Sequence, residues 1–274
     1  MKSLFILALA SGIAFAQAPA APKPAAPKAA APKAAAPKTA AKQTSSANSA
    51  KLLNPAAWMK QAPAEYKAKF TTTKGDFTVQ VHRDWAPLGA DRFYNLVRSG
   101  FFNDVSFYRV VPNFVVQFGA APDPKVEAAW SKANIKDDPV KQSNTRGRVT
   151  FAMGGPGTRT TQVFINLKDN SMLDKYPGGA FAPIGEVVEG MDVVSNLYSG
   201  YGDMAEQGGQ GPSQAMVAKQ GKPYLDKNFP NLDSIKSVTV EGEAAAPAKP
   251  AAPKPAGATK PPAAKPAKPA APAK

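Results

Sequence analysis

The chain has 274 residues and a formal net charge of +14, but this charge is unevenly distributed. Thirteen lysines, Lys2 and six toward each end of the chain, lie in stretches that contain no acidic residue, so the middle of the chain carries a net charge near +1. This balance argues against a nucleic-acid-binding core. The absence of cysteine excludes disulfides, thiol chemistry and a lipid-modified cysteine.

Residues 1–16 have the pattern of a secretory signal peptide. Lys2 precedes an apolar run from Leu4 to Phe15, and Ala14-Phe15-Ala16 is a small-x-small cleavage pattern. The apolar run is too short for a helix that spans a membrane. We therefore expect cleavage near Ala16 and a periplasmic or secreted protein, with an uncleaved anchor segment as the alternative.

Two stretches, residues 17–52 and 244–274, consist mainly of Ala, Pro and Lys. Segments so poor in large apolar side chains cannot offset the entropy lost on ordering, so we expect both to be disordered. They are interpreted as solvating spacers. The alternative is weak electrostatic contact with anionic envelope surfaces. Between them, residues 53–243 have the composition of one globular domain, with its core in residues 66–241.

The order of predicted elements in this domain indicates a mainly β fold. Alternation of apolar and polar residues predicts a hairpin of Tyr66–Thr73 and Asp76–His82 around Lys74-Gly75. A helix is expected from Pro87 to Gly100, and a second, short one at 190–197. Six further strands are expected near 105–111, 115–118, 148–153, 161–166, 182–187 and 235–241. We predict a closed eight-stranded antiparallel β-barrel capped by two helices. The long connections 119–147 and 199–232 are expected to be functional or accessory loops.

Several residue types that often carry chemistry are interpreted as structural here. His82 is the only histidine and is expected at the surface, so zinc sites and catalytic triads lack their parts. Gly154-Gly155-Pro156-Gly157 leads into a predicted strand without a following Gly-Lys-Ser/Thr, so it is interpreted as a tight turn. Asp137-Asp138 and Asp203 lie in predicted loops and are interpreted as solvated carboxylates. We expect no metal site and no cofactor.

The most informative segment runs from Phe107 to Gln117, Phe-Tyr-Arg-Val-Val-Pro-Asn-Phe-Val-Val-Gln. With a period of two, Arg109 shares a strand face with apolar residues, and a cation there needs a partner or a task. A second segment, residues 149–167, is also mostly apolar and contains Gln162. Together they predict a shallow apolar site with a few oriented polar groups, suited to a small apolar ring attached to a peptide.

Both segments resemble the signatures of the cyclophilins. Residues 107–117 are similar to F-H-R-V-x-P-x-F-x-x-Q, and residues 151–164 are similar to the A-x-A/G-G-P-x-T-x-x-S/T-Q-F-F block. The resemblance continues through residues 173–174 and 184–194 and covers about residues 66–241. Residues 123–146 and 199–232 resemble insertions of bacterial members.

The resemblance implies a catalytic group formed by Arg109, Phe114 and Gln117. It implies that the proline ring is held by Phe114, Phe164 and Leu173. The full set of implied substrate-binding residues is Val115, Ala152, Met153, Gln162, Phe164, Met172, Leu173 and Phe181.

Three positions depart from the pattern of the family. The tryptophan at the pocket rim of many eukaryotic members is Met172 here, and the rim histidine is Phe181. Gln117 is followed by Phe-Gly-Ala and not by Gly-Gly-Asp. Because the rim tryptophan offers an indole N–H to the inhibitor cyclosporin, the first departure predicts weak inhibition and leaves proline turnover intact.

The resemblance implies an exported peptidyl-prolyl cis-trans isomerase that assists protein folding. Its partners would be proline-containing peptides and unfolded exported proteins, with no specific nucleic acid, and it would act as a monomer. Two alternatives are a noncatalytic proline-binding module and an envelope-tethering protein whose basic ends do the work. Retention of Arg109 together with Gln117 favours the enzyme.

Overall fold

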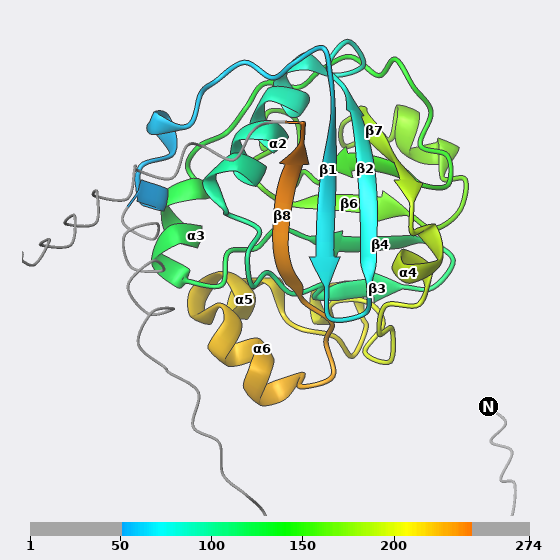
Figure 1. Ribbon diagram of the computed structural model, residues 1–274. Coiled ribbons are helices and arrows are strands. Elements are labelled where there is room, and N and C mark those ends of the chain that lie inside the picture. The colour runs from blue at the N-terminus through cyan, green and yellow to red at the C-terminus, as the bar shows by residue number, and fades with distance from the viewer. Residues whose placement is uncertain (1–50, 243–274) are drawn as a thin grey trace, which may run out of the picture. The chain divides into compact units, whose positions relative to one another are not determined.

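The computed structural model describes residues 51–242 of the chain (Figure 1). The predicted signal peptide, the tail 244–274 and all but the last two residues of the predicted linker 17–52 lie outside the described residues. Of those two, Leu52 packs against the hydrophobic core. Its carbonyl also accepts a hydrogen bond from the Trp130 indole Nε1, at 2.8 Å.

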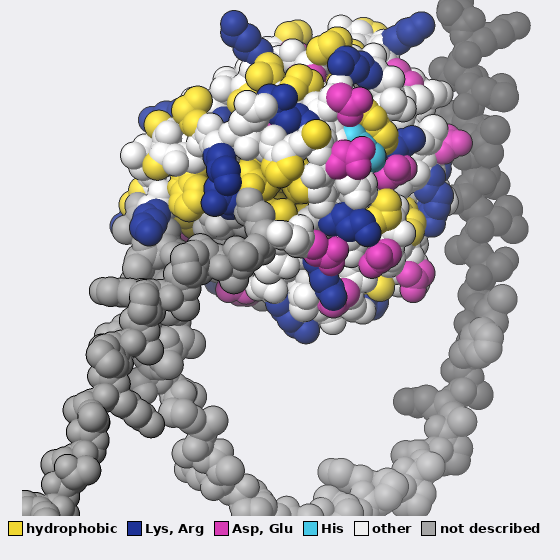
Figure 2. Space-filling model, turned by 45° about the horizontal axis from the view of Figure 1, so that its top comes forward, with side chains coloured by type: hydrophobic (Ala, Val, Ile, Leu, Met, Phe, Trp, Pro, Cys, Tyr) yellow, Lys and Arg dark blue, Asp and Glu magenta, His cyan; other side chains and the backbone are white. Residues whose placement is uncertain are grey.

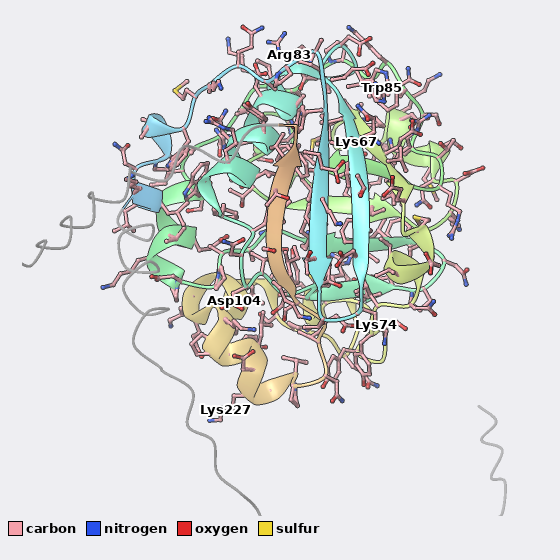
Figure 3. The ribbon with its side chains drawn as sticks, viewed as in Figure 1. Lys67, Lys74, Arg83, Trp85, Asp104 and Lys227 are labelled. Carbon is pink, nitrogen blue, oxygen red and sulfur yellow. The ribbon has the colours of Figure 1, made fainter. Side chains whose placement is uncertain are left out.

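The predicted hairpin is confirmed as strands β1 (Glu65–Thr72) and β2 (Asp76–His82). Along β1 every second residue is buried, as the period of a strand with one covered face requires. Phe70 and Phe77 are paired across the hairpin, and their rings stack at 4.6 Å between centroids. Figure 3 shows Lys74 in the turn, and Arg83 and Trp85 beyond the opposite end of the hairpin.

The eight predicted strands are all present and pair antiparallel in one curled sheet, in the order β3-β4-β6-β5-β7-β2-β1-β8. The remaining strands are β3 (Arg109–Val111), β4 (Val115–Phe118), β5 (Arg148–Phe151), β6 (Val163–Asn166), β7 (Pro183–Glu189) and β8 (Ile235–Glu241). Figure 1 shows β8, β1 and β2 side by side, with β3, β4 and β6 crossing behind them.

Closure of this sheet into a barrel, as predicted from the sequence, is not shown. The end strands β3 and β8 form no ladder with each other. The residues just before β3 and β8 are connected by an isolated bridge between Ser106 and Ser234. Nearby backbone hydrogen bonds, such as that from Ile235 N to Val105 O at 2.8 Å, add to this contact. The described strands therefore form an open, curled sheet.

The main helix α2 (Pro87–Ser99) has the ends that the sequence predicts. Pro87 occupies its first turn, where a missing N–H costs nothing, and Gly100 ends it in a left-handed conformation at φ 72°. The free N–H groups of Leu88 and Gly89 donate to the Asp138 carboxylate at 3.0 and 2.9 Å. Asp138 is buried, so its interpretation as a solvated loop residue was wrong.

The prediction of two helices was incomplete. The predicted helix at 190–197 is α4 (Met191–Ser195), and the connections 119–147 and 199–232 contain three more: α3 (Pro124–Trp130), α5 (Gln214–Gln220) and α6 (Lys222–Asn228). Short 3-10 helices occur at Pro55–Ala57, Ser171–Lys175 and Ala205–Gln207. Within residues 51–242, every helix is too short or too polar to cross a membrane.

Three groups of buried apolar side chains hold the described residues together. The largest fills the space between the sheet and α2. A second joins Tyr108 to Met204, Val217 and Leu225, and so attaches the 199–232 connection beside β3. The third contains Val115, Phe164 and Leu173, with Phe114, Ala152 and Phe181 against them. The third group includes many of the residues expected to bind substrate.

Candidate active site

A cavity of about 330 Å³ lies over strands β3, β4 and β6. It brings together ten of the eleven residues expected from the sequence, which are Arg109, Phe114, Val115, Gln117, Ala152, Met153, Gln162, Phe164, Leu173 and Phe181. Their convergence makes this cavity the candidate site.

Strand register explains how residues far apart in the sequence meet here. In the ladder of β3 and β4, Arg109 is directly opposite Gln117. In the ladder of β4 and β6, Gln117 is directly opposite Phe164. Directly opposite residues on one face have Cβ atoms about 5 Å apart, so these three side chains form a row across three strands. The row sets a cation, an amide and an aromatic ring next to one another.

A hydrogen-bond network fixes the polar end of this row. The Arg109 Nη1 group donates to Gln117 Oε1 at 2.9 Å. The Gln117 amide Nε2 then donates to the Tyr108 hydroxyl at 2.7 Å and to Gln162 Oε1 at 3.1 Å. The Tyr108 hydroxyl donates to the same Gln162 oxygen at 2.6 Å. Burial raises the pKa of Tyr108 far above its usual value, so the hydroxyl stays protonated and remains a donor.

This network leaves the side-chain amides of Gln117 and Gln162 with different hydrogen-bonding capacity. Both N–H groups of Gln117 already have acceptors, so Gln117 orients Arg109 and Gln162 and has no amide donor left for a peptide. Gln162 Oε1 accepts from Tyr108, from Gln117 and, at 3.4 Å, from Gln214. Among residues 51–242, none accepts a hydrogen bond from Gln162 Nε2, which is therefore one amide donor available at the cavity.

The apolar side of the cavity is built from a turn and from strand β6. Asn113 has φ 56° in the Pro112-Asn113 turn, a conformation that Asn tolerates better than most residues, and Phe114 follows it. The centroid of the Phe114 ring lies 5.6 Å from the Arg109 Cζ atom. Phe164 and Phe181 meet edge to face at 5.8 Å between centroids. An aromatic wall beside a held guanidinium suits a ligand that is apolar on one side and polar on the other.

Sequence comparisons agree with this geometry. Residues 67–220 match the family described as cyclophilin type peptidyl-prolyl cis-trans isomerase. This chain belongs to that family. A peptidyl-prolyl cis-trans isomerase of Acinetobacter baylyi is 34% identical over 139 residues, which cover 50% of this chain and 73% of the relative. Peptidyl-prolyl cis-trans isomerase B of Escherichia coli is 34% identical over 134 residues, 47% of this chain and 81% of the relative.

Solved structures of the same family also match this cyclophilin. A Cryptosporidium parvum cyclophilin type isomerase aligns with a TM-score of 0.46 at 18% identity, over 66% of this chain and 99% of its own. A second crystal structure of that protein, determined in the presence of the dipeptide Ala-Pro, aligns with a TM-score of 0.45 at 18% identity, over 64% of this chain and 98% of its own.

Met172 is the one expected site residue that the cavity leaves out. Its side chain is 58% exposed in the 3-10 helix Ser171–Lys175, beside Leu173, which does line the cavity. Phe181 lies where expected, and the Tyr176 ring packs against it at 5.9 Å between centroids. Met172 is therefore exposed to solvent and outside the cavity wall, whereas Phe181 is part of that wall.

Sequence reasoning missed the contribution of the connection 199–232. Met204, Gln207 and Gln214 from this connection line the cavity, as do Gly154, Thr158 and Thr160 from the second signature segment. The sequence indicated that this long, polar connection is functional or accessory, but not which of its residues contact the site. Which of its residues face the cavity depends on packing that is remote in sequence, such as the burial of Met204 against Tyr108.

The interpretation of Asp203 as a solvated carboxylate was wrong. Its Oδ1 accepts from Arg109 Nε at 2.7 Å and its Oδ2 from Arg109 Nη2 at 3.3 Å. The Arg109 side chain is 15% exposed and that of Asp203 is 29% exposed. Partial burial raises the pKa of Asp203, but hydrogen bonds from Arg109 and from the Met204 N–H, with the positive charge of Arg109, outweigh it and lower the pKa overall.

His82 lies outside the cavity, whereas the glycine-rich segment borders it at Gly154. Figure 2 shows the single histidine at the surface beside acidic side chains. His82 is 3.3 Å from the Glu65 carboxylate, and its ring stacks on Trp85 at 4.2 Å. The glycine-rich segment is a turn, with Gly154 N donating to Thr158 Oγ1 at 3.0 Å. Within the part of the chain that the structure describes, no three side chains of the metal-binding types are grouped.

Proposed function

We propose that this cyclophilin accelerates rotation about X-Pro bonds in exported proteins and so assists their folding, with Arg109 as the catalytic residue. The observation that carries the proposal is the placement of the Arg109 guanidinium. It is held on two sides, by Gln117 and Asp203, beside a cavity walled by aromatic rings. Such a site has a rigid donor next to a ring-sized apolar space.

Rotation about a peptide bond needs no nucleophile. Amide resonance gives a barrier of about 18–20 kcal/mol, and an uncatalysed X-Pro bond isomerises in tens to hundreds of seconds. A catalyst must therefore stabilise the twisted amide more than either planar form. In the twisted state the proline nitrogen carries a localised lone pair, which can accept a hydrogen bond that the planar amide cannot.

The residues of the cavity match these requirements. Arg109 has N–H groups left after its bonds to Gln117 and Asp203, and these can donate to the prolyl nitrogen. Phe114, Phe164 and Leu173 hold the ring while the preceding carbonyl swings. The Gln162 amide donor orients the peptide backbone. Each tenfold acceleration needs about 1.4 kcal/mol, so a preorganised donor beside an apolar wall can supply a few powers of ten.

Exchange NMR on a tetrapeptide with an Ala-Pro bond tests the activity. With the mature chain, residues 17–274, we expect cross-peaks between cis and trans forms at mixing times well below one second. The same peptide without protein gives none at these times, because its uncatalysed exchange takes tens of seconds or more. Binding of the peptide without exchange would instead identify a noncatalytic proline-binding module.

Export and partners are a separate part of the proposal. The charge, apolar run and small-x-small pattern of residues 1–16 support cleavage near Ala16 and a periplasmic or secreted monomer. Its substrates would be unfolded exported proteins, and its lysine-rich ends would make only weak contact with anionic envelope surfaces. N-terminal sequencing of the protein from a periplasmic extract should begin at Gln17. A chain that retains Met1 would contradict export with cleavage.

A further inference from the structure

Arg109 is held by a residue that lies 94 positions further along the chain. Asp203 belongs to the connection 199–232, and its carboxylate takes the side edge of the guanidinium through Nε and Nη2. Such two-point pairs fix the orientation of an arginine more tightly than a single hydrogen bond does. The plane of the Arg109 side chain is thus set from outside strand β3.

A count of donors shows what this contact leaves for a ligand. A guanidinium has five N–H groups. Asp203 takes the Nε group and one on Nη2, and Gln117 takes one on Nη1. Two remain, one on each terminal nitrogen, and Arg109 lines the cavity. The two partners together select which edge of Arg109 faces the peptide.

The position of Asp203 is itself fixed. Its Oδ1 also accepts from Met204 N at 2.8 Å, and its backbone carbonyl accepts from Gly211 N at 2.8 Å. Gly209 and Gly211 pack so closely on the Asp203 backbone that a Cβ atom at either would collide with the carbonyl oxygen. Met204 next to it is buried against Tyr108. The connection is therefore anchored by contacts other than the ion pair.

We propose that Asp203 is a positioning residue for the isomerase reaction, which it serves by aligning the two free N–H groups of Arg109 with the twisted peptide bond. This inference rests on the proposed role of Arg109. Its chemical basis is that a hydrogen bond to a transition state is effective only if the donor is already oriented. Without Asp203, the guanidinium can rotate about its last torsions, and the time it spends in the productive orientation falls.

Asp203→Asn is the first test, because the amide keeps the size of the side chain and one acceptor oxygen but loses the charge and the second acceptor. We expect kcat/KM for the Ala-Pro tetrapeptide to fall about tenfold, through kcat, with KM changed less than twofold. Asp226→Asn is the matched control in the same connection, since Asp226 pairs with Lys222 at 3.0 Å but lies outside the cavity. It should leave both constants unchanged.

A double-mutant cycle separates positioning from a purely structural role. Lysine at position 109 cannot make the two-point contact, so Asp203→Asn should cost less than twofold in an Arg109→Lys background. An equal loss in both backgrounds would overturn the proposal, because Asp203 would then act independently of Arg109. A kcat/KM for Asp203→Asn within twofold of the parent would also overturn it.

A readout without catalysis keeps the inference separate from the proposed function. In the parent chain the Arg109 Nε–H should exchange slowly with water, and in Asp203→Asn it should exchange at least about tenfold faster, because its acceptor is weakened. Rapid exchange in the parent would overturn the pairing itself. If the parent shows slow exchange but no isomerase activity, the proposed function fails while the Arg109–Asp203 contact stands.

Discussion

Replacing Arg109 by alanine should remove most isomerase activity and leave the fold intact. The substitution removes the proposed donor to the prolyl nitrogen. Loss of one preorganised donor from a site that excludes water costs roughly 10²–10³ in rate, and we expect a fall of that size in kcat/KM. The effect on kcat should exceed that on KM, because the aromatic wall that holds the proline ring is unchanged.

The effect of the same change on stability follows from the contacts that it breaks. Gln117, which is 5% exposed, loses the donor to its Oε1 atom. Asp203 loses two hydrogen bonds, but its side chain is 29% exposed, so water can replace part of them. A buried acceptor without a donor costs about 1–3 kcal/mol. With partial solvation we expect about 1–2 kcal/mol, a fall of roughly 2–8 °C in Tm for a domain of this size.

The chain offers a matched control for this substitution. Arg83 makes a similar two-point contact with Asp91, at 2.8 and 3.0 Å, with side chains 29% and 25% exposed. It lies outside the cavity, beyond the end of the β1–β2 hairpin (Figure 3). Arg83→Ala should lower Tm by a comparable amount and leave kcat/KM unchanged.

The assays are exchange NMR for kcat/KM and circular dichroism melting for stability, on parent and both variants at the same pH. A folded Arg109→Ala protein with kcat/KM within about threefold of the parent would refute the catalytic role of Arg109. A loss of activity in Arg83→Ala equal to that in Arg109→Ala would refute the reasoning in another way. It would show that general destabilisation, and not the missing donor, slows the reaction.

Three further predictions concern other parts of the chain. Burial raises the pKa of Glu127 in the folded state above its value in the unfolded state. Glu127 therefore contributes stability while it is protonated, and this contribution is lost as pH rises from the unfolded-state pKa through the folded-state pKa. Glu127→Gln should therefore flatten the decline of Tm above about pH 4.5, and a decline as steep as the parent's would contradict this. Deleting residues 17–50 and 244–274 should leave Tm and kcat unchanged, whereas a lower KM in the truncated chain would show that the Ala-Pro and Lys-Pro bonds of these ends compete with substrate. Met172→Trp should strengthen cyclosporin inhibition by no more than about tenfold, because one added indole hydrogen bond contributes about 0.5–1.5 kcal/mol net. Turnover should be unchanged, because Met172 is 58% exposed and lies outside the cavity. Low-nanomolar inhibition of the parent would show that this donor is unimportant.

Local order in the sequence was enough to predict most elements of the domain. The β1–β2 hairpin and the ends of α2 follow from strand alternation, a Gly turn, a first-turn proline and a closing glycine, all of which act within a few residues. The two signature segments likewise contain most of the cavity residues in short runs. Once their strands pair in register, Arg109, Gln117 and Phe164 can only form a row.

Other features depended on contacts between segments that the sequence does not connect. Helices α3, α5 and α6 were missed because their connections are polar and rich in Gly and Pro, and their stability comes from packing on neighbours. The burial of Asp138 at the start of α2 was missed for a related reason. A carboxylate in a loop looks the same in sequence whether it faces water or a helix end.

The sequence by itself determined the family, the antiparallel sheet and most residues of the candidate site, because each depends on short-range periodicity and on compact motifs. Only the tertiary structure decided how Arg109 is held. Its pairing with Asp203 depends on how the 34-residue connection 199–232 packs against β3. The exposure of Met172 depends on the orientation of the 3-10 helix Ser171–Lys175. Neither outcome has a periodic signal, because both are set by long-range packing.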